Sequence, residues 1–274
     1  QQSKHNRRTP MSKITTKLIL AAAGTLLASA LGPISLQGAI VGQWDFDNGD
    51  LSATTGQDLT YLDGNNGPTD QQTDFGTTTS LSIPDIAGEE AKVMAFPACT
   101  DLTMGYVMPT PSSGNGGGQL VNQWTIIMDV MFPAASDGSW RGLLEVDERL
   151  TEDSDFFVND ANGIGISGQY DGSIVADTWH RVAVVVDNTV GSGLMLKFID
   201  GIQVGEQGTD GVDGRWAYSP SGIGELFNDN GDEANAGYVN SIQFRNEALA
   251  IGDVRALGGP SADGIPETIP LTPA

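Results

Sequence analysis

The sequence predicts an all-β protein: a two-sheet antiparallel β-sandwich of the jelly-roll type with one short C-terminal helix. About a dozen short runs of alternating apolar and polar residues are separated by Gly, Asp and Asn, a pattern typical of strands and turns. Gly is abundant, at 36 of 274 residues. Only residues 251–257, followed by Gly258, have the composition and the stop signal of a helix.

The clearest strands lie in residues 178–205. In the first of them, one histidine and three valines occupy the alternate positions 180, 182, 184 and 186, so this face is predicted to pack on a core. The opposite face is mixed in polarity. Asp200-Gly201 then separates two apolar runs, and both residues tolerate positive φ, which predicts a two-residue hairpin turn of the primed type.

The other predicted strands are short and are bounded by turn residues. They span residues 40–47, 92–96, 102–108, 121–132, 140–146, 156–159, 164–169, 223–227 and 238–245. Residues 48–90 are polar and offer only short strand candidates. The chain shows neither an internal repeat nor a second domain, so we expect one domain over residues 40–259 and a Pro-rich tail over residues 260–274.

Residues 1–39 have the pattern of an export leader that begins at Met11. Two lysines precede an apolar run over residues 18–27, and small residues follow, so we expect cleavage after Ala30 or Ala39. The run is shorter than the roughly 20 residues that span a membrane. We therefore expect a secreted, cell-surface or periplasmic protein without membrane insertion of the mature chain. The alternative is an N-terminal core helix.

Charge and cysteine content limit the classes of partner. The formal net charge is −22, but five of the 13 basic residues and none of the 35 acidic residues lie in residues 1–39. A domain this acidic repels nucleic acid and anionic membranes, so we expect neither as a partner, and its self-repulsion favours a monomer. Cys99 is the one cysteine, which excludes an intramolecular disulfide, and we expect it to be a small buried side chain.

Several stretches resemble the laminin-G-like branch of the concanavalin A-like lectin/glucanase superfamily. They are Trp-Thr-Ile-Ile-Met-Asp-Val at 124–130, Trp-His-Arg-Val-Ala-Val at 179–184, Phe-Ile-Asp-Gly at 198–201, Ser-Ile-Gln-Phe-Arg-Asn-Glu-Ala-Leu at 241–249, and the opening Trp-Asp-Phe-Asp at 44–47. The resemblance implies a jelly-roll fold. It leaves activity open, because the family includes carbohydrate-binding modules, adhesion domains, pentraxins and glycoside hydrolases.

Catalytic chemistry has little support in the sequence. Hydrolases on this fold that resemble laminarinases place their carboxylates on one strand, as Glu-x-Asp-x-x-Glu or Glu-x-Asp-x-Glu. Glu145 and Asp147 match the first half of this motif, but Arg149 and Leu150 stand where the second glutamate would lie. We expect a rim of solvated charge there. His180 falls on the valine face of its strand, so we expect a structural histidine and a binding protein rather than an enzyme.

Calcium is the metal that the sequence favours, because it takes six to eight oxygen ligands from carboxylates, amides and carbonyls. The densest acidic loop is Asn-Asp-Asn-Gly-Asp-Glu at 228–233. The candidate ligands of a structural Ca²⁺ are Asp45, Asp47, Asp229, Asp232 and Glu233. The loop is not an EF-hand, since Glu233 and Val239 stand at its sixth and twelfth positions. A solvated acidic loop is the alternative.

Four aromatic residues are the candidate carbohydrate-binding residues, because they lie beside loops rich in Asp, Ser and Gly. They are Trp140, Tyr170, Trp216 and Tyr218. The alternative is that these rings close the ends of the core. The sequence therefore predicts a secreted, non-catalytic module that binds a glycan or an extracellular polysaccharide. A glycoside hydrolase or polysaccharide lyase on the same fold, and a structural or adhesive surface protein without a sugar site, are the alternatives.

Overall fold

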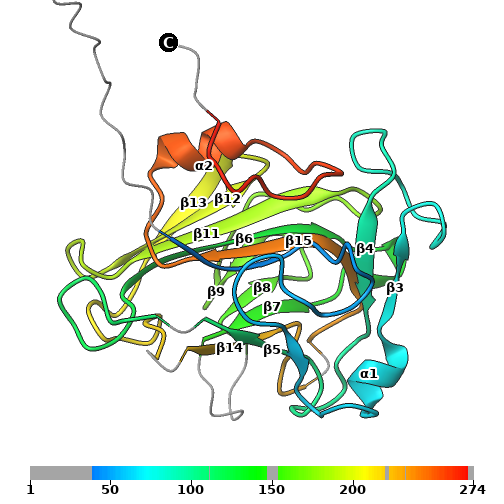
Figure 1. The fold of residues 1–274 in the computed structure, drawn as a ribbon. Coiled ribbons are helices and arrows are strands. Elements are labelled where there is room, and N and C mark those ends of the chain that lie inside the picture. The colour runs from blue at the N-terminus through cyan, green and yellow to red at the C-terminus, as the bar shows by residue number, and fades with distance from the viewer. Residues whose placement is uncertain (1–38, 111, 147–153, 220–221, 232, 271–274) are drawn as a thin grey trace, which may run out of the picture. The chain divides into compact units, whose positions relative to one another are not determined.

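The computed structural model describes residues 39–110, 112–146, 154–219, 222–231 and 233–270, and it confirms the predicted all-β sandwich (Figure 1). The larger sheet contains β1 (Ile40–Trp44), β3 (Asp74–Thr77), β4 (Lys92–Phe96), β6 (Gln123–Met131), β11 (His180–Asp187), β12 (Leu194–Ile199), β13 (Ile202–Gly208) and β15 (Gly237–Arg245). The smaller sheet contains β2 (Thr60–Tyr61), β5 (Tyr106–Pro109), β7 (Arg141–Glu145), β8 (Phe156–Val158), β9 (Ile164–Ile166), β10 (Gln169–Asp171) and β14 (Ile223–Leu226). The helices are α1 (Pro68–Gln72), the short 3₁₀ turn η1 (Ala134–Ser136) and α2 (Ile251–Leu257).

The two sheets form two stacked layers (Figure 1). The larger sheet has the order β13-β12-β11-β6-β15-β4-β3, with β1 paired to the C-terminal half of β15. The smaller sheet has the order β10-β9-β8-β7-β14-β5-β2. All of the strand pairs within the described residues are antiparallel. In the part of the chain that the structure describes, no helix is both long and apolar enough to cross a membrane.

The local signals in the sequence identify most elements. β4 and α2 have the predicted bounds, and Asp200 and Gly201 have φ values of 52° and 75° between the paired Ile199 and Ile202, as a primed turn requires. Residues 164–169, predicted as one strand, instead begin a tight hairpin from β9 to β10. In residues 48–90 the structure adds α1, β2 and β3, which are too short for a periodic pattern.

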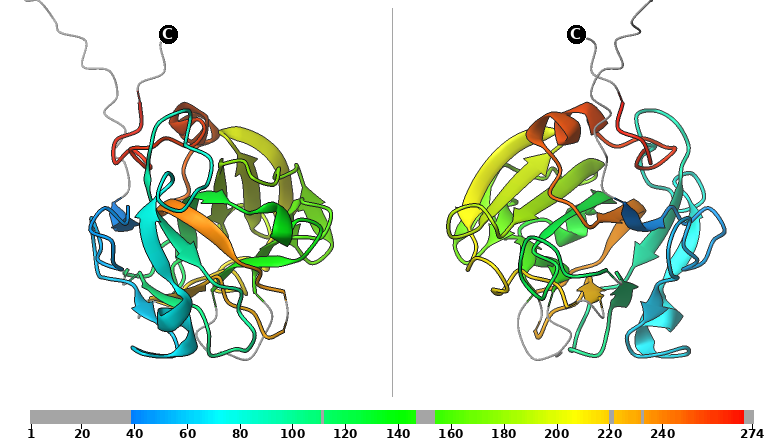
Figure 2. Two further views of the ribbon diagram at one scale, coloured as in Figure 1. Left: turned by 90° about the vertical axis from the view of Figure 1, so that its right-hand side faces the viewer. Right: turned by 60° about the vertical axis from the view of Figure 1, so that its left-hand side comes forward.

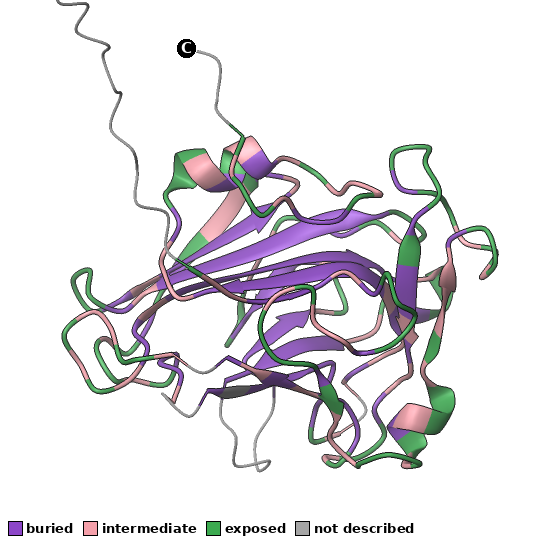
Figure 3. Ribbon diagram, in the orientation of Figure 1, coloured by how far each residue is buried: buried purple, intermediate pink, exposed green. Residues whose placement is uncertain are grey.

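The main core lies between the sheets. On β11, Val182, Val184 and Val186 are buried there, as the alternation predicts, and they share this core with the rings of Trp124 and Phe244. The outer face of β11 is buried as well (Figure 3). The prediction of one buried face is therefore incomplete, because chain elements far away in sequence cover the other face.

A second apolar cluster lies on the outer face of the larger sheet. Its buried members are Ile127, Ala183, Val185, Leu196, Phe198, Leu249, Val254, Leu257 and Ile265. They show that α2 and the following C-terminal segment pack on the side of this sheet that faces away from the smaller sheet (Figures 1 and 2). We refer to residues 261–267 as the C-terminal strap.

A buried ion pair holds the C-terminal strap to the sheet. Nε and Nη2 of Arg181 donate to the two carboxylate oxygens of Asp129, both at 2.7 Å. Nη1 of Arg181 donates to the Leu257 carbonyl at 2.6 Å and Nη2 to the Gly264 carbonyl at 3.1 Å. Burial raises the pKa of the Asp129 carboxyl, and the hydrogen bonds from Arg181 oppose that shift. The pair thus joins two strands to the end of α2 and to the strap.

Side chains of β1 and β15 complete the attachment of the strap. Gln43, Gln243 and Arg245 donate to three consecutive backbone carbonyls, those of residues 265–267, at 3.0, 3.3 and 2.9 Å. These contacts depend on the backbone of the strap and not on its side chains. The compact unit therefore extends past residue 259, where the sequence analysis placed the start of a Pro-rich tail.

Replacing Arg181 by Met should lower the free energy of unfolding by about 3–5 kcal/mol, because it leaves the Asp129 carboxylate buried without its partner. Urea denaturation followed by tryptophan fluorescence measures this change. Arg255→Met on the exposed side of α2 is the matched control, and it should change stability by no more than about 0.5 kcal/mol. Equal midpoints for the two variants would show that the ion pair does not hold the strap.

Candidate functional site

Three of the connections that carry the chain between the two sheets lie side by side at one end of the sandwich. They join β4 to β5, β6 to β7 and β14 to β15. Ala234, in the third connection, forms antiparallel bridges with both Cys99 in the first and Arg141 at the end of the second. The Cys99 amide donates to the Ala234 carbonyl at 2.8 Å. We call this part of the molecule the crossover end.

The connection from β6 to β7, residues 132–140, contacts two other loops there. Ser136 Oγ donates to the Ala236 carbonyl at 2.7 Å, and the Ala134 amide donates to Asp177 Oδ1 at 3.0 Å. Ser136 is buried, so its hydrogen bond lies inside the protein rather than on its surface. These contacts fix the connection in place, although its sequence has no strand pattern.

The buried Arg141 side chain ties the β8–β9 turn to this end. Nη2 of Arg141 donates to the Asn159 carbonyl and to Asn162 Oδ1, both at 2.7 Å, and its guanidinium lies 5.3 Å from the centre of the Phe132 ring. Burial lowers the pKa of Arg141, and the nearby Asp137 carboxylate opposes that shift. Asn162 in turn donates to Asp137 at 2.9 Å. Hydrogen bonds therefore join the turn to the connection.

Two of the four predicted carbohydrate-binding residues meet at the crossover end. The rings of Trp140 and Tyr170 are both half-buried, and their centres lie 5.2 Å apart at 76°. The Trp140 ring also packs edge-on against the buried Phe157, at 5.6 Å and 86°. The Trp140 carbonyl accepts a hydrogen bond from Asn235 Nδ2 at 2.8 Å. The ring contact with Phe157 positions the indole, and the hydrogen bond positions the Trp140 backbone.

Tyr170 lies on the outer face of the smaller sheet. The next residue, Asp171, forms an ion pair with Lys197, whose Nζ also donates to the Gln169 carbonyl at 2.7 Å. Lys197 is buried between Met195 and Ile199, which line the core between the sheets. Successive strand residues point to opposite faces, so Asp171 faces the larger sheet and Tyr170 faces outward.

The other two predicted carbohydrate-binding residues lie in the core. Trp216 is 6% exposed and Tyr218 is 0% exposed. The Tyr218 ring lies 5.1 Å from the rings of both Trp124 and Phe244, and the Trp216 carbonyl accepts the Trp124 indole hydrogen bond. The expectation that the Trp216 and Tyr218 rings lie at the surface is wrong, and they pack in the core as in the alternative. The polar turns on either side of them do not keep this segment at the surface.

The predicted calcium ligands that the structure describes do not converge. Asp45 accepts hydrogen bonds from Gln43 beside the strap, and Asp229 follows β14 and accepts hydrogen bonds from the amides of Ser154 and Gly231. The Glu233 carbonyl accepts the Gly142 amide, and Asp47 is exposed. Among the described residues, no group of three or more His, Cys, Asp and Glu side chains could hold a metal. Asp232 lies outside the described residues, so calcium stays a prediction.

Of the residues that could serve in catalysis, the structure describes Glu145 and His180, and both are buried. Glu145 is 1% exposed and stands directly opposite Glu225, which is 2% exposed, so the expectation of a solvated rim is wrong for Glu145. Asp147 lies outside the described residues. His180 Nε2 accepts the Val175 amide at 3.1 Å, which places the proton on Nδ1, 2.8 Å from Asp200. Both ring nitrogens are engaged, as in a structural histidine.

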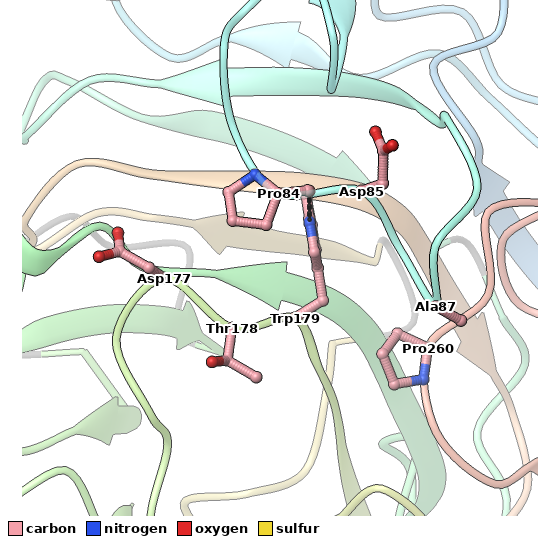
Figure 4. Close-up of a pocket in the computed structure, with 7 residues that line it drawn as sticks. All are labelled: Pro84, Asp85, Ala87, Asp177, Thr178, Trp179 and Pro260. Carbon is pink, nitrogen blue, oxygen red and sulfur yellow. Dashed lines mark hydrogen bonds between the residues drawn. The ribbon is translucent and has the colours of Figure 1, made fainter.

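The structure also contains hollows that the sequence did not predict, and two of them are lined by aromatic rings. The first, of about 320 Å³, surrounds Trp179, whose indole donates to the Pro84 carbonyl at 2.8 Å. Figure 4 shows the Asp85 and Asp177 carboxylates at its rim, pointing away from the indole. The second, of about 470 Å³, lies beside Tyr238. Each hollow is lined by segments far apart in sequence, and no local pattern reveals such a convergence.

Comparison with known proteins identifies the fold and not a family. No protein-family model matches this chain, and no curated protein matches it. Among solved structures, domain 4 of AbnA, a GH43 extracellular arabinanase from Geobacillus stearothermophilus, was determined in complex with arabinotriose. It matches with a TM-score of 0.51 and 18% identity over 80% of this chain and 98% of that domain.

A second solved structure has the same arrangement. The binding domain of botulinum neurotoxin serotype G matches with a TM-score of 0.50 and 11% identity. The match covers 80% of this chain and 50% of that domain, so this chain spans about half its length. At identities this low, the structural matches establish a shared β-sandwich fold only. The function of this chain must be inferred from its own residues.

Burial of Tyr218 predicts a specific titration. Burial raises the pKa of Tyr218 well above its usual value of 10.0, and the nearby Asp155 carboxylate adds to the shift. Alkaline titration followed by tyrosinate absorbance should therefore give superimposable curves for the wild type and Tyr218→Phe until the protein unfolds. A Tyr218 ring exposed to solvent would instead make the wild-type curve rise further near pH 10.

The same shift makes stability depend on pH. The folded-state pKa of Tyr218 exceeds its unfolded value of about 10, so its contribution is complete below pH 10 and is lost as the pH rises above it. Tyr218→Phe should lose less free energy of unfolding over that range than the wild type.

Proposed function

We propose that this protein binds carbohydrate without catalysing its conversion, and that Trp140 and Tyr170 make the central contact. The observation that carries the proposal is the pair of half-buried, nearly perpendicular rings at the crossover end. Aromatic rings of this kind offer an apolar surface to the C–H groups of a sugar, and the indole offers an N–H to its hydroxyls. A furanose or pyranose ring presents both kinds of group.

The packing of the pair favours binding. The Trp140 ring packs against Phe157, its backbone carbonyl accepts the Asn235 hydrogen bond, and Tyr170 lies in strand β10. A side chain that is already ordered loses little conformational entropy on binding. Asn235 is itself half-buried, and Asp137, close by in the β6–β7 connection, is exposed. Both can hydrogen-bond sugar hydroxyls without a change of backbone conformation.

The structural comparison agrees with this proposal. The arabinanase domain was determined with arabinotriose bound, so a β-sandwich of this kind can carry an oligosaccharide site. We infer a neutral oligosaccharide or polysaccharide as the partner, with the protein acting outside the cytoplasm as the leader pattern in residues 1–39 predicts. A calcium requirement belongs to the same proposal and is tested with it.

The test compares two tyrosines in edge strands of the same sheet. Tyr170 lies on β10 and Tyr61 on β2, and both rings are half-buried. Tyr170→Ala and Trp140→Ala should each weaken binding to arabinotriose roughly tenfold, about 1.4 kcal/mol, while Tyr61→Ala should leave the affinity unchanged. Isothermal titration calorimetry with arabinotriose measures the three variants against the wild type.

The same measurement is extended to a glycan array, in buffer with calcium and in buffer with a chelator. Binding in both buffers would support the sugar site and exclude a calcium requirement. No binding to any glycan in either buffer would overturn the proposal and favour a structural or adhesive role. Equal losses in Tyr170→Ala and Tyr61→Ala would place the site elsewhere on the sandwich.

A further inference from the structure

An exposed carboxylate lies beside the Trp140–Tyr170 pair. Asp137 belongs to the connection from β6 to β7 and precedes Trp140 by three residues, so their Cα atoms are at most about 11 Å apart. Gly138 follows Asp137, and a Cβ atom added at Gly138 would have no neighbour within 4 Å. The described chain therefore leaves the surroundings of Gly138 open, and both Asp137 and the Trp140 ring lie within the reach of one trisaccharide.

Asp137 is also connected to the Tyr170 side of the pair. Asp137 Oδ1 accepts a hydrogen bond from Asn162 Nδ2 at 2.9 Å, and Asn162 Oδ1 accepts one from Arg141 Nη2 at 2.7 Å. The next residue, Gly163, lies so close to Tyr170 that an added Cβ atom would be 3.1 Å from the Tyr170 Cβ. The β8–β9 turn therefore contacts Asp137 with one residue and Tyr170 with the next.

The Asp137 carboxylate can accept further hydrogen bonds. Within the described residues, Oδ1 accepts the bond from Asn162, Oδ2 accepts none, and the side chain forms no ion pair. A carboxylate accepts hydrogen bonds and donates none, and a bond that it accepts from a hydroxyl group is charge-assisted. Such a group favours a sugar hydroxyl and repels a sugar carboxylate.

The positive charge near Asp137 is not accessible to an acidic sugar. Arg141 is 0% exposed, and its Nη2 already donates to the Asn159 carbonyl and to Asn162. Asp137 is the one charged residue in the connection over residues 132–140. The charge that this connection presents to solvent beside the pair is therefore negative.

We propose that Asp137 determines the specificity of this site, and that it selects neutral sugars over uronic acids. The inference rests on the proposed function, in which the rings of Trp140 and Tyr170 make the central contact. Apolar contacts with two rings do not distinguish a neutral sugar from an acidic one, because both kinds present C–H groups. The charge of Asp137 does distinguish them, and the net charge of −22 adds to the repulsion of an anionic sugar.

Asp137→Asn tests the inference, because asparagine keeps the shape of the side chain and can still accept the Asn162 hydrogen bond. The loss of a charge-assisted hydrogen bond should weaken arabinotriose binding roughly tenfold. Asp47→Asn is the matched control and should leave the affinity unchanged, since Asp47 is exposed, follows β1 in the larger sheet and alters the net charge equally. Isothermal titration calorimetry measures both variants, with the neutral glycan that binds best on the array as the probe if arabinotriose does not bind.

A charge reversal tests the selection against acidic sugars. Trigalacturonate and its methyl ester share one backbone, and only the acid is charged. Asp137→Lys should raise the affinity for trigalacturonate by about tenfold, because an ammonium group then pairs with a sugar carboxylate. Asp47→Lys, which alters the net charge equally, should give no such gain, and neither variant should gain affinity for the methyl ester.

The outcomes separate this inference from the proposed function. If Asp137→Asn binds the neutral probe as the wild type does while Trp140→Ala binds it more weakly, Asp137 does not determine specificity and the sugar site stands. Equal trigalacturonate affinities in Asp137→Lys and Asp47→Lys would also overturn the inference. If neither arabinotriose nor any glycan on the array binds the wild type, the proposed function fails and the inference fails with it. Urea unfolding of each variant distinguishes a loss of binding from a loss of folding.

Discussion

The crossover end depends on one constraint: three connections between the sheets must pass one another in the same space. Ala234 satisfies it by pairing with Cys99 and Arg141 at once, and its small side chain lets the three segments approach closely. Arg141 then extends the junction to the β8–β9 turn through two hydrogen bonds. Trp140 precedes Arg141 directly, so this junction determines where its indole lies.

The larger sheet has a different constraint, because both of its faces are buried. Most jelly-roll sheets that face water on one side alternate apolar and polar residues, but here buried polar side chains occupy the outer face beneath the C-terminal strap. Asp129 and Arg181 neutralise each other's charge, and Arg181 also satisfies two carbonyls of the covering chain. A buried ion pair is a poor source of stability unless its remaining hydrogen bonds are made, and here they are made to the backbone. The strap therefore belongs to the fold.

Local patterns in the sequence were sufficient for much of the fold. The valine alternation on β11, the Asp200-Gly201 turn and the Gly258 stop each act through nearby residues, and each appears in the structure as predicted. The β9–β10 hairpin was missed because Ser167 adopts a φ of 53°, which a serine rarely signals. The strap was missed because its proline content suggests an extended tail, and only the sheet provides its partners.

The site was less predictable than the fold. Trp140 and Tyr170 could be proposed because loops flank both, but the same argument applied to Trp216 and Tyr218, which the structure buries. What separates the two pairs is the path of the chain after the polar turn, and this depends on contacts with strands far away in sequence. The Tyr238 hollow depends on the register of β15 with β4 and on three connections that meet, so no single stretch of sequence contains it.

The most direct test of a sugar site at the crossover end is an NMR titration of the tryptophan indole N–H signals with an arabinan oligosaccharide. The chain has five tryptophans. The indoles of Trp44 and Trp124 donate to backbone carbonyls at 2.9 and 2.8 Å and are buried, so their signals should stay in place. The account predicts that the Trp140 signal shifts as the oligosaccharide is added. An unchanged Trp140 signal in a titration that moves other resonances of the protein would contradict it.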